Sequence, residues 1–329
     1  MEQSVARGPD ELEAAASAPA TYIMTAMPTT SILDEHRRRN FTTRGRWDAV
    51  ASHRERVMAL VAEARELVSK ESESGQAVLL QGVGPRRGPS ICILGPGNAN
   101  DIDLKQIAQD FDGITLVDLD EAAVARAMSS LDASALSRVK RCCPVDLTGV
   151  LPTLESWRRT GRPKDAEISA LKRTATGAPR PDAKTFDIVA STCILTQLID
   201  AVYMSLPTGD PRSVELLMAV RDRHLEMILE LLNPGGLGVL VSDCVVAEPG
   251  HELPPLGELL LAPAASSVPT RMRQQEFFVG TDPFEIRDYY KRLRCPGPTV
   301  DDVHIRGPWR WEVGNRWLGV CGLILRRSA

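Results

Sequence analysis

Two glycines and one acidic residue mark the segment of this chain that is best suited to hold a ligand. The apolar run Ile91–Leu94 leads into Gly95-Pro96-Gly97-Asn98. Glycine at such a turn lets the backbone approach a ligand closely. A second apolar run ends at Asp118, roughly 20 residues after Gly95, which is the spacing at which a carboxylate reaches ribose hydroxyls. The glycine turn, the crossover segment and the acidic strand end therefore predict a nucleoside-binding half-domain.

Short apolar runs alternate with helical patterns around this turn. The runs predicted to be strands are Ile91–Leu94, Ile114–Val117, Phe186–Ala190 and Gly238–Val241. The predicted helices are Ile102–Phe111, Glu121–Leu131, Ile194–Ser205 and Val214–Leu232. Such alternation is typical of a doubly wound α/β fold with a Rossmann-like parallel sheet. Near the end, two apolar runs flank Gly314-Asn315 and predict an antiparallel C-terminal hairpin.

Composition divides the chain into three parts. Residues 1–40 are rich in Ala, Ser, Thr and Pro and predict a flexible leader. Residues 41–87 contain an amphipathic helix from Trp47 to near Ser72, which we expect to form an N-terminal helical cap, followed by a linker. Residues 88–329 form the main domain. Two insertions are expected in it, a solvated loop with a short helix at about 153–184 and Pro-rich loops at about 247–300 with a helix capped by Asp282.

Over roughly residues 88–327 the chain resembles the class I S-adenosylmethionine-dependent methyltransferases. The resemblance rests on a series of motifs in the family's order, not on the glycines alone. These motifs are the glycine turn, Val117-Asp118-Leu119-Asp120, Pro144-Val145-Asp146-Leu147, Phe186-Asp187-Ile188-Val189 and Asn233-Pro234-Gly235-Gly236. The sequence departs from the family's pattern at Ile93, where an acidic residue is common, and at Ala99, which replaces a third glycine.

The resemblance implies S-adenosylmethionine as the cofactor and assigns its contacts residue by residue. Gly95 and Gly97, with Pro96 and Asn98 in the same turn, would contact the amino acid part and the ribose. Asp118 would bind the ribose hydroxyls, Leu119 would pack on adenine, and Asp146 with Leu147 would receive the adenine amino group. Ser191 and Thr192 would line the face where the methyl group is transferred. Because Ile93 and Ala99 depart from the family's pattern, we expect polar groups just after the turn, Asp101 among them, to hold the cofactor's ammonium group instead.

Simpler structural roles compete with these assignments. Asp120 is better placed to cap a helix than to bind a ligand, and Asp146 could cap the turn that follows it. The residue types assign neither a catalytic base nor a nucleophile, because each of the five His residues is more often structural at such positions. No spacing typical of a metal site occurs, and the seven Cys residues predict reduced, mostly buried thiols.

The expected activity is methyl transfer to a small-molecule acceptor. The fourth motif continues as Ser191-Thr192-Cys193-Ile194 instead of the Asn/Asp-Pro-Pro-aromatic sequence of many enzymes that methylate base amino groups. RNA or protein acceptors stay open, because variable segments set the acceptor. Three other functions also stay open: a noncatalytic binding module of the same fold, an aminopropyl transferase and an NAD-dependent oxidoreductase.

The charge balance and hydropathy limit the partners. There are 39 Lys and Arg against 43 Asp and Glu, a net charge of -4, which argues against binding to DNA through its phosphates. No segment is a good membrane span, since the uncharged stretch 14–33 contains Pro19 and Pro28. With no basic leader before that stretch, we expect a cytoplasmic protein. The sequence does not indicate an oligomeric state.

Overall fold

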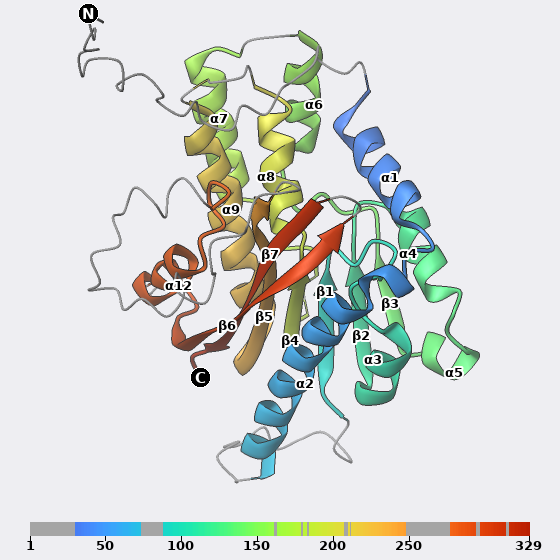
Figure 1. Cartoon of the computed structure of the whole chain (residues 1–329). Helices are drawn as coiled ribbons and strands as arrows, with labels where there is room; N and C mark the ends of the chain where they lie inside the picture. The colour runs from blue at the N-terminus through green and yellow to red at the C-terminus, as the bar shows by residue number, and fades with distance from the viewer. Residues whose placement is uncertain are drawn as a thin grey trace, which may run out of the picture. The chain divides into compact units, whose positions relative to one another are not determined.

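The computed structural model describes residues 30–73, 88–160, 163–178, 180–182, 184–206, 210, 212–247, 277–293, 297–313 and 316–329. Within these residues, seven strands form one sheet in the order β3-β2-β1-β4-β5-β7-β6 (Figure 1). The strands are β1 Ser90–Leu94, β2 Gly113–Val117, β3 Val139–Cys142, β4 Phe186–Thr192, β5 Leu232–Ala247, β6 Val300–Val313 and β7 Arg316–Arg327. The pairs among β1 to β5 are parallel, whereas β7 runs antiparallel to both β5 and β6. The doubly wound sheet and its C-terminal hairpin are thus confirmed.

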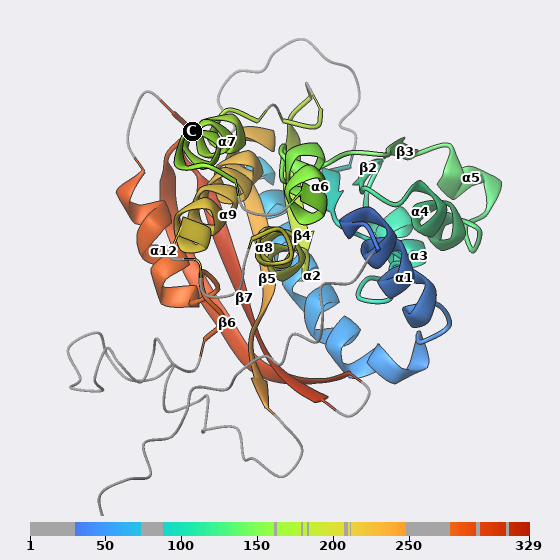
Figure 2. The ribbon, with the colours of Figure 1, turned by 90° about the horizontal axis from the view of Figure 1, so that it is seen from above.

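Helices cover both faces of this sheet (Figure 2). They are α1 Ile32–Thr43, α2 Ala51–Glu73, α3 Leu104–Asp110, α4 Glu121–Met128, α5 Ala133–Leu136, α6 Leu151–Thr160, α7 Asp165–Thr176, α8 Leu195–Tyr203, α9 Arg212–Leu231 and α12 Pro283–Arg292. Asp282 caps α12, as predicted, by accepting a hydrogen bond from the Phe284 amide. None of the described helices combines the length and apolarity that a membrane span requires.

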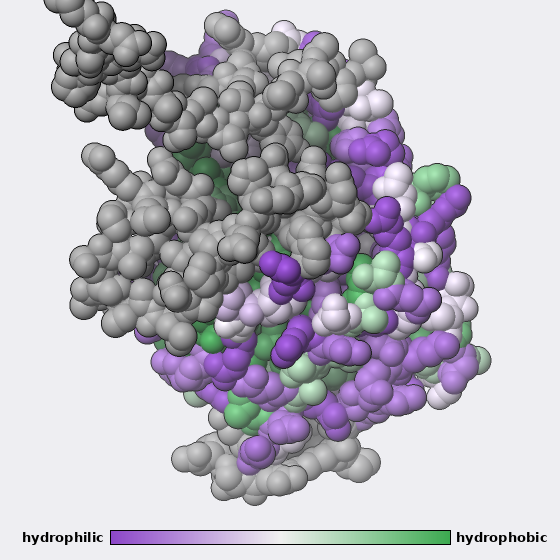
Figure 3. All heavy atoms as spheres, in the orientation of Figure 1, coloured by the Kyte–Doolittle hydropathy of each residue, from purple (hydrophilic) through white to green (hydrophobic). Residues whose placement is uncertain are grey.

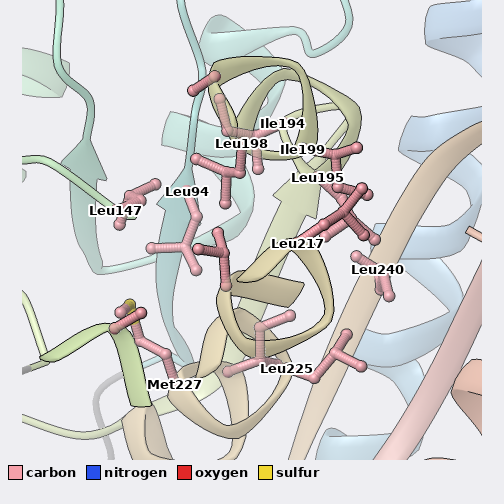
Figure 4. Close-up of a cluster of buried hydrophobic side chains, with 14 of the residues drawn as sticks. Leu94, Leu147, Ile194, Leu195, Leu198, Ile199, Leu217, Leu225, Met227 and Leu240 are labelled. Atoms are coloured by element: carbon pink, nitrogen blue, oxygen red, sulfur yellow. The ribbon is translucent and has the colours of Figure 1, made fainter. Parts of the chain in front are cut away.

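Among the described residues, alternation along the strands divides most of the core into two large hydrophobic clusters, and a third, small cluster lies around Cys244 and Cys321. In β1, Ile91 and Ile93 pack with α2 and α3, while Cys92 and Leu94 face the cluster formed with α6 to α9. Side chains of the cluster formed with α6 to α9 are drawn in Figure 4, where Leu94 lies among residues of α8 and α9. A central strand that is apolar on both faces is typical of a parallel sheet with helices on both sides.

Strand β3 was not predicted. Its burial alternates weakly, and Lys140 and Arg141 are exposed. It pairs only with β2 among the described strands, so it forms one edge of the sheet. Charged residues are tolerated at a sheet edge, and here they conceal the apolar pattern that revealed the inner strands.

The segment around 153–184 is not the solvated loop that its charge suggested. It contains α6 and α7, whose apolar faces are buried in the core: Leu154 and Trp157 from α6, and Ile168, Leu171 and Ala175 from α7. Arg158 itself is only 9% exposed. Basic residues on the outer faces of two amphipathic helices hid their inner periodicity.

The first helix begins inside the segment expected to be the flexible leader. Residues 32–40 belong to α1, and the Ser31 hydroxyl caps it by accepting a hydrogen bond from the Asp34 amide. The amphipathic helix α2 forms as predicted but packs on the sheet through Val57, Leu60, Val61 and Ala64. Residues 1–29, the linker 74–87 and most of the second insertion lie outside the described residues.

The described surface on the face shown in Figure 3 is mostly hydrophilic, and its hydrophobic side chains are scattered. Scattered apolar side chains are normal on a folded protein.

Candidate cofactor site

The glycine turn lies at the carboxyl end of β1, between β2 and β4. Gly95 and Gly97 have φ values of +71° and +51°, a region that side chains rarely adopt. The Gly95 amide donates to the Val117 carbonyl at 2.9 Å, which ties the turn to β2. A Cβ atom on Gly95 would lie 2.6 Å from Cβ of Ile194. The turn therefore needs glycine at 95 for its conformation and for the close approach of α8.

Asp118 holds this turn and the start of α4 together. One carboxylate oxygen accepts from the Gly97 amide at 2.8 Å, and the other accepts from the Asp120 amide at 2.8 Å. The side chain is 2% exposed. Asp120 caps α4, as predicted, by accepting from the Ala123 amide at 3.1 Å. Asp118 thus has a structural role in addition to the ligand contact predicted for it.

A pocket lies between this turn and α1, and we call it the α1 pocket. Five of the predicted site residues line it: Gly95, Asp118, Leu119, Asp146 and Leu147. The other lining residues come from α1, the β3–α6 segment and the α8 region: Ile32, Glu35, His36, Arg39, Val145, Thr148, Leu151, Ile194, Gln197, Leu198, Ala201 and Met204. The pocket is at the carboxyl ends of β1, β2 and β4, where open α/β sheets bind their ligands.

Helix α1 covers this pocket. His36 extends from it to within 3.6 Å of Asp118 (Nε2 to Oδ1), and this buried Nε2 has no hydrogen-bond partner among the described residues. Arg39 pairs with Asp200 on α8 at 3.0 Å. Burial raises the pKa of Asp200, and the Arg39 guanidinium opposes that shift. A ligand hydroxyl suits this place, because a hydroxyl can form hydrogen bonds with the unpaired buried nitrogen and with the carboxylate beside it.

Asp146 lies at the pocket wall and also organises the backbone there. Its carboxylate accepts from the amide of Thr148 at 2.8 Å, from the hydroxyl of the same residue at 2.6 Å, and from the Leu151 amide at 2.8 Å. These bonds close the turn after β3 and cap the start of α6. The capping role that competed with the adenine role is therefore present.

The remaining predicted residues do not line the α1 pocket. Pro96 is buried within the turn, and the Gly97 amide binds Asp118. Asn98 donates to the backbone of Asn40 at the end of α1. Asp101 lies on the other side of the loop, 3.8 Å from Nε2 of His53.

The two predicted residues of β4 are buried in the sheet. Ser191 is fully buried and lies 2.8 Å from Nε2 of His224 (Oγ to nitrogen). Burial lowers the pKa of His224 to about 4, so this ring is neutral at pH 7. Thr192 is 2% exposed.

Sequence reasoning missed His36, Arg39 and the environment of His53. Only Ile32 of α1 is buried, so this helix has almost no apolar periodicity. A signal was present in Ser31-Ile32-Leu33-Asp34, because Ser followed three residues later by an acidic residue is typical of a helix start. His53 was expected on a solvated face but is 0% exposed, on the same helix face as Val57.

The strand order and the site together define the class of fold. A parallel sheet β3-β2-β1-β4-β5 extended by an antiparallel β7 and an edge β6, with a glycine turn after β1 and an acidic residue after β2, is the class I methyltransferase fold.

The chain is similar to several solved structures that are distant from it in sequence. The N-methyltransferase NodS from Bradyrhizobium japonicum WM9, in complex with S-adenosyl-L-homocysteine, is 11% identical over 91% of this chain and 100% of its own, with a TM-score of 0.44. A methyltransferase from Methanosarcina mazei is 12% identical over 74% of this chain and 94% of its own, with a TM-score of 0.38. A putative sarcosine dimethylglycine methyltransferase from Galdieria sulphuraria is 10% identical over 81% and 86% of the two chains, with a TM-score of 0.36. The chain matches no protein-family model and no curated protein.

Proposed function

We propose that this protein transfers a methyl group from S-adenosylmethionine to an acceptor molecule. The observation that carries the proposal is the position of Asp118, whose carboxylate supports the glycine turn and faces the α1 pocket at the end of β2. The orphan Nε2 of His36 beside it supports a ligand with hydroxyl groups at this point. These two side chains would hold the ribose of the cofactor through its hydroxyl groups.

The proposed contacts follow the lining of the pocket. The backbone of Gly95, Pro96 and Gly97 would approach the amino acid part of the cofactor, and Asp118 its ribose. Leu119 would pack on adenine, with Asp146 and Leu147 at the adenine edge. Contacts of Asn98, Ser191 and Thr192 with the cofactor stay predictions, whereas Asp101 lies outside the α1 pocket, 3.8 Å from Nε2 of His53. S-adenosylmethionine would supply an electrophilic methyl group, and the protein accelerates such a transfer chiefly by holding the acceptor in line.

We infer that α1 moves when the cofactor binds. The α1 pocket encloses about 50 Å³, whereas sites for ligands of cofactor size measure about 300–1,000 Å³. On the other side of α1, an outer groove of about 600 Å³ is lined by Arg37 and Phe41 of the same helix. Leu119 borders both hollows. A displacement of α1 would join them into a site of sufficient size.

The contacts of α1 favour such a displacement. The helix is held mainly by polar contacts, including Arg39 with Asp200 at 3.0 Å and the Leu33 amide with Glu155 at 2.9 Å. Exposed and half-exposed ion pairs contribute little to stability, typically about 0–1 kcal/mol each. Opening α1 therefore costs far less than opening one of the apolar helices.

The proposal is tested by calorimetric titration of the purified protein with S-adenosylhomocysteine, S-adenosylmethionine and NAD in parallel. We expect micromolar binding of the two adenosyl ligands that carry sulfur and no binding of NAD. Binding of NAD alone would overturn the proposal in favour of an oxidoreductase. The absence of all binding, in folded protein, would favour a noncatalytic module, which the buried Ile93 and the positive φ of Ala99 would then explain.

A further inference from the structure

A second group of reactive side chains lies next to the glycine turn, on the side opposite Asp118. Nε2 of His53 is 3.8 Å from Oδ1 of Asp101 and 3.7 Å from Sγ of Cys193. Asp243, in the second half of β5, accepts a hydrogen bond from the Thr196 hydroxyl at 2.7 Å. These residues come from α2, from the loop after β1, from the position after β4 and from β5 where it extends beyond β4. They therefore gather at the edge of the sheet where ligands bind.

The spacing of His53, Asp101 and Cys193 would suit a metal ion, since their ligand atoms lie within 4.8 Å of one another. The tautomer of His53 argues against this interpretation. The indole N–H of Trp309 donates to Nδ1 of His53 at 3.0 Å, and an indole nitrogen can only donate. Nδ1 is therefore the acceptor, and the proton of the neutral ring is on Nε2, which is the nitrogen a metal would need. Metal-binding His residues usually donate from their second nitrogen instead.

His53 is held as a neutral donor. Trp311 stacks on its ring with centroids 4.2 Å apart and an angle of 14°. Burial lowers the pKa of His53 to about 3, so the ring stays uncharged at pH 7. The side chain is 0% exposed, and its Nε2–H points into the space between Asp101 and Cys193, where the thiol is its sole hydrogen-bond partner among the described residues. A fully buried donor without an oxygen partner is uncommon. The carboxylate oxygen beside this one is Oδ1 of Asp101, at 3.8 Å.

The two carboxylates of this group have no direct ion pair with a Lys or Arg in the described ranges. Arg54 acts on Asp101 and Arg39 acts on Asp243 only from a distance. Burial raises the pKa of Asp101 to about 7, with a contribution from the charge of Asp243, and burial raises the pKa of Asp243 to about 6. Asp101 is still 23% exposed. A ligand that brings a positive charge would offset the cost of these buried charges.

This carboxylate pair adjoins the α1 pocket. Cys193 has a φ of +50° and immediately precedes Ile194, which packs against Gly95 and lines that pocket. Gln197, another lining residue, donates to the Cys193 carbonyl at 3.4 Å. A group bound by Asp101 and Asp243 would therefore lie just across this turn from a ligand in the α1 pocket.

We propose that Asp101 and Asp243 bind the amino group of the methyl acceptor, so that the substrate of this protein is an amine. The inference rests on the proposed methyl transfer. An ammonium group would first give one proton to the Asp101 carboxylate. The freed nitrogen lone pair would then form the new N–C bond, while the S–C bond breaks and its electron pair stays on sulfur. The products are an N-methylammonium group and S-adenosylhomocysteine, and Asp101 returns its proton to solvent.

The experiment uses the full-length protein saturated with S-adenosylhomocysteine and titrates it with benzylamine, 2-phenylethylamine and 1,4-diaminobutane. The corresponding alcohols are the neutral controls. We expect at least one amine to bind and its alcohol not to bind. In Asp101→Asn and in Asp243→Asn, amine affinity should fall at least tenfold while S-adenosylhomocysteine affinity stays within twofold. Asp103→Asn is the matched control, because Asp103 caps α3 from the same loop and Asn caps equally well.

Each other result has a definite meaning. If both Asn variants lose S-adenosylhomocysteine affinity tenfold, the carboxylates hold the cofactor's own ammonium group and the inference is wrong. If the wild type binds S-adenosylhomocysteine but none of the amines, the inference alone fails. If it binds no adenosyl ligand, the proposed function fails first. One equivalent of Zn²⁺ bound by wild type and lost in Cys193→Ser would identify a metal site instead.

Discussion

Replacing Asp118 with alanine should loosen the glycine turn and the start of α4 together. The carboxylate accepts one hydrogen bond from the Gly97 amide and one from the Asp120 amide, both at 2.8 Å. The residue is 2% exposed, so water cannot readily replace these acceptors. Alanine would leave both amides without a partner inside the protein.

The size of the effect follows from these two bonds. A hydrogen bond to a charged group contributes about 1.5–3 kcal/mol, so Asp118→Ala should lower the free energy of unfolding by about 3–6 kcal/mol. Asp118→Asn keeps one acceptor oxygen and should lose about half as much. The same asparagine variant should bind S-adenosylhomocysteine more weakly, by roughly 1–3 kcal/mol, if Asp118 also bonds the ribose.

Urea unfolding of the two variants measures the first effect, and calorimetry below the unfolding transition measures the second. Glu121→Gln is the control, because it removes an exposed negative charge from the next helix. It should stay within about 0.5 kcal/mol of wild type. A loss below about 1 kcal/mol in Asp118→Ala would refute the idea that this carboxylate holds the turn.

Three further predictions concern backbone geometry and titration. Gly95→Ala should cost about 2–5 kcal/mol of unfolding free energy, since it adds a clash with Ile194 to a positive φ. Gly235→Ala is the control, because Gly235 has φ +77° and open space around it, and it should cost only about 1–2 kcal/mol. Equal losses in urea unfolding would contradict the clash. Ala99 has φ +55°, so Ala99→Val should lose about 2 kcal/mol or more of unfolding free energy, while Ala99→Gly stays within about 1 kcal/mol of wild type. A valine variant as stable as wild type would show that this backbone is not constrained. Burial raises the pKa of Asp101 to about 7, above its value in the unfolded chain, so the native state binds the extra proton and stability falls as pH rises from about 4 to 7. Asp101→Asn should remove this loss, so its unfolding free energy relative to wild type should rise by about 2–3 kcal/mol from pH 5 to pH 8. The same difference in unfolding free energy at both pH values would count against the raised pKa.

The inner part of the sheet could be predicted from the sequence because its buried strands consist of continuous apolar runs. Ile91–Leu94 and Ile114–Val117 are apolar on both faces, since helices cover both sides of the strands they form. The position of Asp118 at a strand end followed from that pattern. An edge strand has a weaker apolar pattern because part of it is exposed. For this reason β3, with its exposed Lys140 and Arg141, was not predicted.

The walls of the candidate site were harder to predict because they depend on long-range contacts. His36 becomes a candidate site residue only when α1 packs over Asp118, and no local sequence pattern predicts that packing. His53 is different, because it lies three positions after the buried Val50 and four before the buried Val57. That spacing puts it on the apolar face of its own helix, so its burial could have been predicted.

Gly95 and Ile194 are far apart in the sequence but form one steric unit. The side chain of Ile194 occupies the space that any side chain at 95 would need. Neither position can change freely during divergence of such a sequence: a larger residue at 95 becomes tolerable only after 194 has become smaller. Chains recombined between these two positions should therefore fold poorly unless both residues come from the same parent. Ile194→Gly is the substitution that we expect to compensate for Gly95→Ala.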